Sequence, residues 1–258
     1  MIYTKNPAQI QKMRDAGKLL HQVLEHLKTM IKPGMTTLEI DREAERMIRA
    51  AGATPSFKGF EGFPFTICAS VDEEVVHGFP SDKPLREGQL LSVDCGLILH
   101  GWQADSAFSA PVGKASDEVM KLMKVTEECF WLGAKQARAG NRLGDIGWAV
   151  QQHAEANGYG VIRDLTGHGI GRNMHEEPSV PNFGREGHGV KLRPGMTLAI
   201  EPMIAKGDYH VAELEDGWTV VTEDSSVCSH YEHTIVINEN GLPELLSYPG
   251  FALTEEEE

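Results

Sequence analysis

The chain has 258 residues, of which 41% are hydrophobic and 24% charged, a balance typical of a globular protein that can bury a full core. Its 24 basic and 38 acidic residues give a net charge of −14, which argues against a nucleic-acid-binding surface. The sequence has no apolar run near its start and no stretch long enough to cross a bilayer, so we expect no signal peptide, a cytoplasmic location and no membrane partner.

Two helices are predicted near the N-terminus. Asn6-Pro7 combines an N-cap side chain with a proline in the first turn, and apolar residues follow at helical spacing up to Pro33-Gly34. The segment Thr36–Glu39 matches a capping box and begins a second helix that stops near Gly52. Residues 53–65, which are rich in Gly, Phe and Pro, are expected to form a loop.

Residues 90–108 are predicted to form two β-strands that meet at a tight His100-Gly101 turn. In this register Gly96 faces Asp105, and Asp94 lies on the same face as Gly96 because side chains alternate along a strand. The two aspartates would then be diagonal neighbours, roughly 7–8 Å apart at the backbone. Two carboxylates pointing from an apolar hairpin repel each other, so a metal ion between them is the simplest explanation. An exposed hairpin face with two solvated acids is the alternative.

An internal similarity links residues 85–94 with residues 192–201, since each contains a turn, a strand and a final carboxylate, Asp94 or Glu201. It suggests a duplicated α+β half with both acids meeting at a central axis. The remaining expected elements are a strand at 66–71, helices at 116–139 and 143–157, and strands near 196–205, 210–214, 217–223 and 231–238.

Three other residues that could take part in chemistry lie in the second half of the chain, and a fourth, His77, lies in the first half. His168 and His175 belong to the glycine-rich stretch 166–178, where glycines let a ligand approach the backbone closely. A glycine-rich connector with incidental histidines is the alternative there. Glu232 lies on a predicted strand, where an exposed glutamate is the ordinary interpretation, and His77 precedes a turn and is uninformative alone.

Taken together, these residues form a possible metal-binding set. Asp94 and Asp105 come from the hairpin, His168 from a glycine-rich turn, and Glu201 and Glu232 from separate strands. Carboxylates and an imidazole suit Mn, Fe or Co and are usable by Zn. Four carboxylates carry more charge than one divalent ion balances, so two ions about 3.5–4 Å apart, bridged by carboxylates and a hydroxide, fit the set.

With these motifs the sequence resembles the type I methionine aminopeptidases over nearly its whole length. The resemblance implies a pita-bread fold, an α+β architecture in which two pseudo-symmetric halves surround a dinuclear metal site. The motifs that carry it are His77-Gly78 after two valines, Asp94-x10-Asp105, the Thr166–Pro178 loop, Ala199–Pro202 and Tyr231–Thr234.

The resemblance also implies roles for single residues. Asp94 and Asp105 would bind one metal and His168 and Glu201 the other, while Asp105 and Glu232 bridge both. The two divalent ions (Co, Mn, Fe or Zn) would acidify a water that attacks the first peptide bond, and Glu201 would carry its proton to the leaving nitrogen. His77 and His175 would hydrogen-bond the substrate peptide. The expected methionine pocket consists of Phe60, Phe63, Cys68 and Trp218.

The implied activity is removal of the initiator methionine from nascent proteins and peptides, with a small second residue preferred. The expected partners are peptide or nascent-protein N-termini, and the ribosome is a candidate; the chain is expected to act as a monomer without nucleic acid or membrane. Two alternatives stay open, namely the same fold acting on Xaa-Pro bonds and a catalytically inactive member that binds peptides. Only about 75 residues precede His77, which disfavours the first, and the complete ligand set disfavours the second.

Residues 1–250 are expected to form one catalytic domain because no Gly/Ser-rich linker interrupts them, and residues 251–258 an acidic, disordered tail. The cysteines are scattered without a C-x-x-C pair, so we expect neither a disulfide framework nor a structural zinc site. They are Cys68, Cys95, Cys129 and Cys228.

Overall fold

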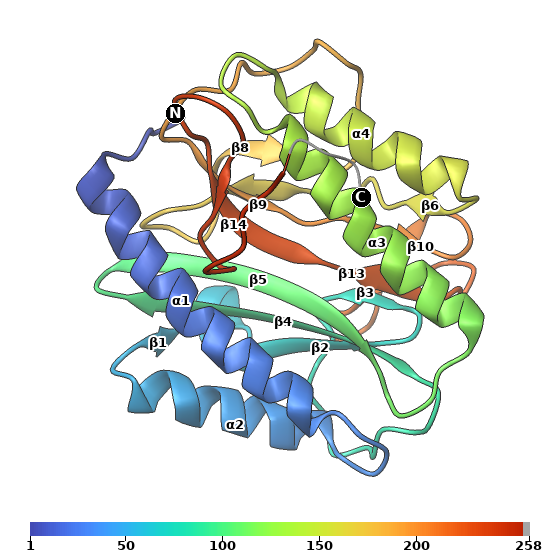
Figure 1. Cartoon of the computed structure of the whole chain (residues 1–258). Coiled ribbons are helices and arrows are strands. Elements are labelled where there is room, and N and C mark those ends of the chain that lie inside the picture. The colour runs from blue at the N-terminus through green and yellow to red at the C-terminus, as the bar shows by residue number, and fades with distance from the viewer. Residues whose placement is uncertain (255–258) are drawn as a thin grey trace.

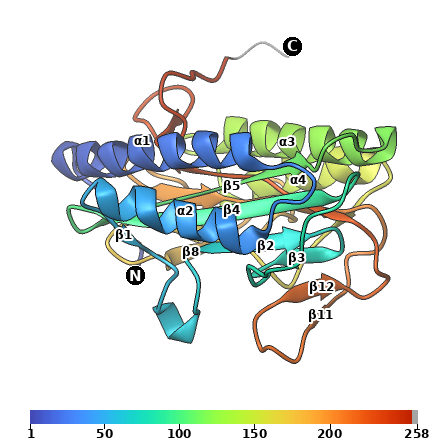
Figure 2. The same ribbon diagram turned by 90° about the horizontal axis from the view of Figure 1, so that it is seen from below.

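The structure, a computed structural model, describes residues 1–254 and places four α-helices on one face of a large antiparallel sheet (Figure 1, Figure 2). The helices are α1 (Pro7–Met30), α2 (Thr37–Ala50), α3 (Asp117–Gln136) and α4 (Leu143–Ala156), and Phe60–Gly62 forms a turn of 3₁₀ helix. The strands are β1 (Thr54–Pro55), β2 (Ile67–Val71), β3 (Glu74–Val76), β4 (Leu90–Leu99), β5 (Trp102–Pro111), β6 (Gly160–Val161), β7 (Gly167–Gly169), β8 (Glu176–Val180), β9 (Thr197–Ile200), β10 (Met203–Ala205), β11 (Val211–Glu213), β12 (Val220–Thr222), β13 (Cys228–His230), β14 (Glu232–Val236) and β15 (Glu244–Leu245).

The first two helices begin at the predicted capping residues. The Asn6 side chain accepts a hydrogen bond from the N–H of Gln9 at 3.0 Å, and the Gln9 side chain accepts one from the N–H of Asn6 at 2.9 Å. The same reciprocal bonds join Thr36 and Glu39 at the start of α2. Both capping predictions are confirmed, and each satisfies backbone donors that a helix start leaves free.

Helix α3 begins after the N-cap Ser116 as expected but ends at Gln136, before the predicted end at residue 139. The N–H of Ala137 donates to the carbonyl oxygen of Ala134 in a tighter turn. The N–H of Gly140 then donates to the carbonyl oxygen of Leu192, in a distant segment, at 3.0 Å. By Gly140 the chain therefore bonds to a distant segment instead of continuing the helix, which a local pattern does not reveal.

Strands β5 and β14 lie side by side at the centre of the large sheet. Its main path runs β1-β4-β5-β14-β9-β7-β8, with β2 paired to β4 and β15 paired to β14. Strand β4 lies outside β5, and β9 lies outside β14 on the other side (Figure 1). Asp94 on β4 and Glu201 directly after β9 therefore occupy equivalent places in the two halves, as the internal similarity predicts. The glycines of the two matching turns, Gly88 and Gly195, have φ values of 88° and 80°.

The prediction of one continuous strand over residues 196–205 is wrong. The segment is divided into β9 and β10 at Glu201-Pro202, and the two parts pair in different sheets, β9 with β14 and β10 with β13. Proline has no N–H to donate to a strand ladder, so the ladder stops there. The break leaves Glu201 at a strand end. The strands predicted near 210–214, 217–223 and 231–238 are present as β11, β12 and β14.

Helix α1 packs so closely on the segment after β15 that only glycine fits at Gly17, where a Cβ atom would overlap the carbonyl oxygen of Leu246. We expect Gly17→Ala to lower the free energy of unfolding by about 1–3 kcal/mol, because the crowding outweighs the usual helix preference for alanine. Urea denaturation will measure the change. Lys18→Ala, at the exposed neighbouring position, should stay within ~0.5 kcal/mol of wild type. A stabilised Gly17→Ala variant would contradict the proposed close contact.

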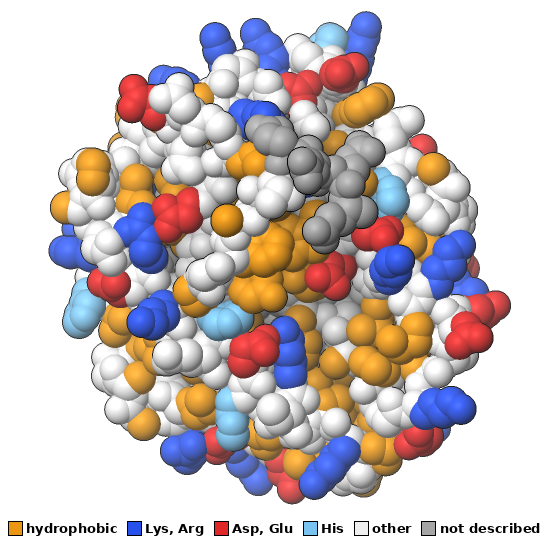
Figure 3. Space-filling model, viewed as in Figure 1, with side chains coloured by type: hydrophobic (Ala, Val, Ile, Leu, Met, Phe, Trp, Pro, Cys, Tyr) orange, Lys and Arg blue, Asp and Glu red, His pale blue; other side chains and the backbone are white. Residues whose placement is uncertain are grey.

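The face that carries the helices has acidic and basic side chains scattered among hydrophobic ones (Figure 3). No helix within residues 1–254 is long and apolar enough to cross a membrane. Of the predicted tail, residues 255–258 lie outside the described residues. In the part that the structure describes, the Phe251 ring stacks on Tyr248 with centroids 5.1 Å apart.

Candidate metal centre and substrate cavity

The predicted hairpin register is confirmed. Strands β4 and β5 pair so that Gly96 faces Asp105 and Leu99 faces Trp102. The connecting residues His100 and Gly101 have φ values of 53° and 76°, the left-handed conformation that a two-residue hairpin turn needs. The register places Asp94 and Asp105 on one face of the hairpin, and both line the same cavity.

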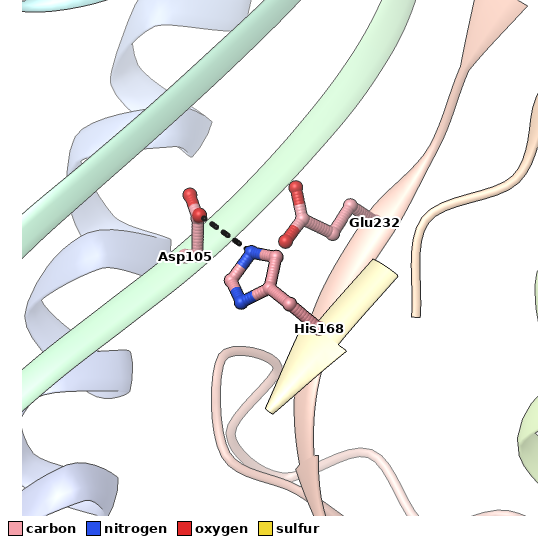
Figure 4. A group of neighbouring side chains, drawn as sticks. All are labelled: Asp105, His168 and Glu232. Carbon is pink, nitrogen blue, oxygen red and sulfur yellow. Dashed lines mark ion pairs between the residues drawn. The ribbon is translucent and has the colours of Figure 1, made fainter. Parts of the chain in front are cut away.

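Three side chains from separate strands converge at the floor of this cavity (Figure 4). Asp105 comes from β5, Glu232 from β14 and His168 from β7, and one ligand atom of each lies within 4.8 Å of the others. The Nε2 atom of His168 lies 3.8 Å from Oδ2 of Asp105 and 3.6 Å from Oε1 of Glu201. These distances are too long for hydrogen bonds and leave room for an ion between the groups.

His168 lies on a strand rather than in the turn predicted for it, which corrects the sequence analysis. Strand β7 pairs with both β8 and β9, with His168 opposite Ser179 on one side and Ala199 on the other. The flanking Gly167 and Gly169 make this possible, since a Cβ atom at either would overlap backbone carbonyl groups of the neighbouring strands. The glycines therefore serve close strand packing as well as access to the histidine.

The hydrogen bonding of His168 fixes which nitrogen faces the carboxylates. Its Nδ1 lies 2.9 Å from the carbonyl oxygen of Gly169, which can only accept, so Nδ1 carries the proton. Burial lowers the pKa of His168 to about 4, so the ring is neutral near pH 7. The unprotonated Nε2 then points its lone pair at Asp105 and Glu201, the arrangement of a histidine that binds a metal.

The carboxylates of the cluster lack a compensating positive charge among the described residues. Burial raises the pKa of Asp94 to about 7 and raises the pKa values of Asp105, Glu201 and Glu232 well above their usual range, with mutual repulsion as a further cause in the last three. Within residues 1–254, the buried atoms Asp94 Oδ1, Asp105 Oδ1 and Glu232 Oε1 have no hydrogen-bond partner. Unpartnered buried oxygens around a neutral imidazole nitrogen fit a divalent cation.

His230 is a buried neighbour of this cluster that the sequence analysis did not select. Its Nε2 lies 4.0 Å from an oxygen of Glu201 and 4.0 Å from an oxygen of Glu232, and it has no hydrogen-bond partner in the described part of the chain. The signal in the sequence was its position two residues before Glu232, because alternate residues of an extended segment share a face. Although β13 ends at His230 and β14 begins at Glu232, the side chains of these two residues still lie close together.

The cavity has a volume of about 550 Å³ and brings together all the residues that the resemblance implied. Phe63 packs edge-on against Trp218 with ring centroids 5.1 Å apart, and the His77 ring is also edge-on to Trp218, with centroids 6.3 Å apart. His175 lies 4.5 Å from His168, ring centroid to ring centroid. The wall also includes Phe60 and Cys68, and the floor includes Asp94, Asp105, His168, Glu201 and Glu232.

The backbone at His77 is held in an unusual conformation. Its φ value is 60°, in the left-handed region that few residues other than glycine adopt. Burial lowers the pKa values of both His77 and His175, which favours the neutral form of each imidazole, with a single N–H donor. A strained histidine that lines a cavity is typical of a functional site.

The comparisons with known proteins agree with this geometry. The family model for metallopeptidase family M24 matches residues 11–239. A methionine aminopeptidase from Clostridium perfringens is 52% identical over 96% of this chain and 99% of its own length. The crystal structure of the methionine aminopeptidase from Rickettsia prowazekii has a TM-score of 0.95 at 39% identity and covers 96% of this chain and 100% of its own.

The chain belongs to metallopeptidase family M24, and within it to the type I methionine aminopeptidases. The α+β pita-bread fold that the sequence predicts is confirmed. An Xaa-Pro dipeptidase from Bacillus anthracis shares this fold, with a TM-score of 0.76 at 23% identity, over 97% of this chain and 63% of its own. Membership in a metallopeptidase family means that this chain uses divalent metal ions. The cluster of Asp105, His168 and Glu232 fits that use.

Proposed function

We propose that this protein removes the N-terminal initiator methionine from nascent proteins and peptides and prefers a small second residue. The observation that carries the proposal is the cluster of buried, unpartnered carboxylates and one neutral imidazole at the floor of an aromatic-lined cavity. The methionine aminopeptidases that align over almost the whole chain support the same reaction.

We assign two divalent ions, Co, Mn, Fe or Zn, to the cluster. Asp94 and Asp105 would hold one ion, His168 and Glu201 the other, and Asp105 and Glu232 would contact both. Four carboxylates balance two divalent charges, and this balance would offset the cost of burying them. When bound, such ions lower the pKa of water toward 7 and polarise a carbonyl group.

The protein's own groups would move the proton and hold the peptide. Glu201 lies at the cavity floor with its side chain 14% exposed, so its carboxylate can receive a proton from water and deliver it to the nitrogen of the departing residue. His77 and His175 both line the cavity, where they would hydrogen-bond the substrate at its first peptide bond. Their neutrality keeps them from repelling the substrate's ammonium group.

The walls of the cavity suit a methionine side chain. The rings of Phe60, Phe63 and Trp218 and the thiol of Cys68 line one space, and thioethers pack favourably against aromatic rings. Burial raises the pKa of Cys68 well above its usual range, so its sulfur stays a neutral thiol. The proposal includes action as a monomer in the cytoplasm on peptide and nascent-protein N-termini, with the ribosome as a candidate partner and without nucleic acid or membrane.

Cleavage of two tripeptides, Met-Ala-Ser and Ala-Pro-Ser, by metal-stripped protein reloaded with Mn²⁺ or Co²⁺ tests this function. We expect release of methionine from the first peptide and no cleavage of the second. Chromatography of the free amino acids will measure both. The metal-stripped protein without added ions is the control and should release nothing.

Cleavage of Ala-Pro-Ser alone would transfer the assignment to the Xaa-Pro peptidases that share the fold. Failure to cleave either peptide with Mn²⁺ or with Co²⁺ would contradict the enzymatic proposal and favour a peptide-binding role.

A further inference from the structure

His175 is held at the cavity by a short loop between β7 and β8. This loop, residues 170–175, connects His168 at the cavity floor to Glu176, the first residue of β8. The N–H of Gln103 donates to the carbonyl oxygen of Gly171 at 2.8 Å, which ties the loop to β5. The place of the His175 ring therefore depends on how firmly the loop is fixed.

We propose that Lys5 is a positioning residue for His175, acting through a buried ion pair with Glu176; the proposal rests on the function given above. The Nζ atom of Lys5 lies 2.7 Å from Oε2 of Glu176, and the two side chains are only 5% and 10% exposed. The residues are 171 positions apart in sequence. The pair thus joins the N-terminal segment directly to the residue after His175.

Glu176 uses its other oxygen to shape the loop. Its Oε1 accepts hydrogen bonds from the N–H groups of Arg172 at 2.9 Å and Asn173 at 3.2 Å. One carboxylate therefore binds the loop backbone on one side and the Lys5 ammonium on the other. A buried carboxylate without a cation is costly, so the loop geometry depends on Lys5.

Lys5 itself is fixed by its surroundings. Its N–H donates to the carbonyl oxygen of Gly195 at 2.7 Å, in the turn before β9, and the next residue, Asn6, caps α1. On the loop side, a Cβ atom at Gly171 would lie 2.6 Å from Oε1 of Glu176 and 2.7 Å from Cε of Lys5. The pair fills its space closely, and a rigid lysine gives the loop a fixed anchor.

Loss of the Lys5 charge should loosen the loop and misplace His175. We expect Lys5→Met to lower kcat for Met-Ala-Ser roughly 10- to 100-fold, because a displacement of about 1 Å at a catalytic group can cost ~100-fold. The Mn²⁺ content should equal that of wild type. Amide hydrogen exchange of residues 170–176 should become faster, while exchange in α3 and α4 stays unchanged.

Two further variants separate positioning from a general structural effect. Lys5→Met combined with His175→Ala should be no slower than His175→Ala alone, since a residue that acts through His175 has no effect once that ring is gone. Lys5→Met combined with Glu176→Gln should recover activity, because the neutral amide oxygen can still accept from Arg172 and Asn173. Lys206→Met, which removes an exposed ion pair with Glu118, is the matched control and should behave as wild type.

Unchanged exchange in residues 170–176 of Lys5→Met would overturn the proposal, whatever the activity. The proposal would also be overturned if the Lys5→Met/His175→Ala variant lost as much kcat as the two single variants lose together. That result would mean that Lys5 does not act through His175. A wild-type protein that releases no methionine would instead refute the proposed function, and hydrogen exchange would still decide whether Lys5 anchors the loop.

Discussion

Changing Asp105 to asparagine will remove most of the stability that the protein gains from metal, together with its peptidase activity. Asp105 has a side chain 5% exposed, and its Oδ2 lies 3.8 Å from Nε2 of His168 in the cluster where we assign Asp105 to both ions. With Mn²⁺ at about 100 times its Kd, binding adds ~2.7 kcal/mol to the wild type, or about 5–10 °C in Tm for a chain of this size. Thermal melts with and without Mn²⁺ will measure the shift.

The same variant should behave differently without metal. Metal-free Asp105→Asn should be at least as stable as the metal-free wild type, because a neutral amide replaces a carboxylate buried beside others. Asp82→Asn, the same change at an exposed position, is the control and should keep the full Mn²⁺ shift. An unchanged Mn²⁺ shift in Asp105→Asn would refute the assignment of Asp105 as a metal ligand.

Changing Glu201 to glutamine will lower kcat for methionine release at least ~100-fold, within the range of ~10²–10⁴ that general acid–base catalysis contributes. The glutamine keeps the size of the side chain and an oxygen that can contact a metal, but it cannot receive a proton from water. Steady-state kinetics on Met-Ala-Ser, together with the Mn²⁺ content of the same sample, will separate lost proton transfer from lost metal.

Glu213→Gln, on the exposed strand β11, removes the same charge away from the cavity and should retain wild-type kcat. A metal-loaded Glu201→Gln variant with kcat close to that of wild type would rule out Glu201 as the proton carrier.

Local patterns predicted the helices and the hairpin because the forces that form them act between near neighbours. Asn6 and Thr36 bond to residues three positions ahead, and the His100-Gly101 turn fixes the register of β4 and β5 by itself. That register was enough to place Asp94 and Asp105 on one face. The same reasoning failed at Gln136, where α3 ends because later backbone groups bond to a distant segment.

The sequence by itself determined the residue types of the site, the α+β class and, through the similarity of residues 85–94 and 192–201, the relation between its two acids. Apart from the hairpin of β4 and β5, only the tertiary structure decided which strands lie side by side. It placed His168 on β7 between two other strands, divided the predicted strand at Glu201-Pro202 and buried His230 next to the carboxylates. It also paired Lys5 with Glu176. The spacing of apolar residues in the sequence indicates on which face of its own helix or strand a side chain lies. Contacts between helices and strands far apart in the sequence depend instead on how those elements pack together.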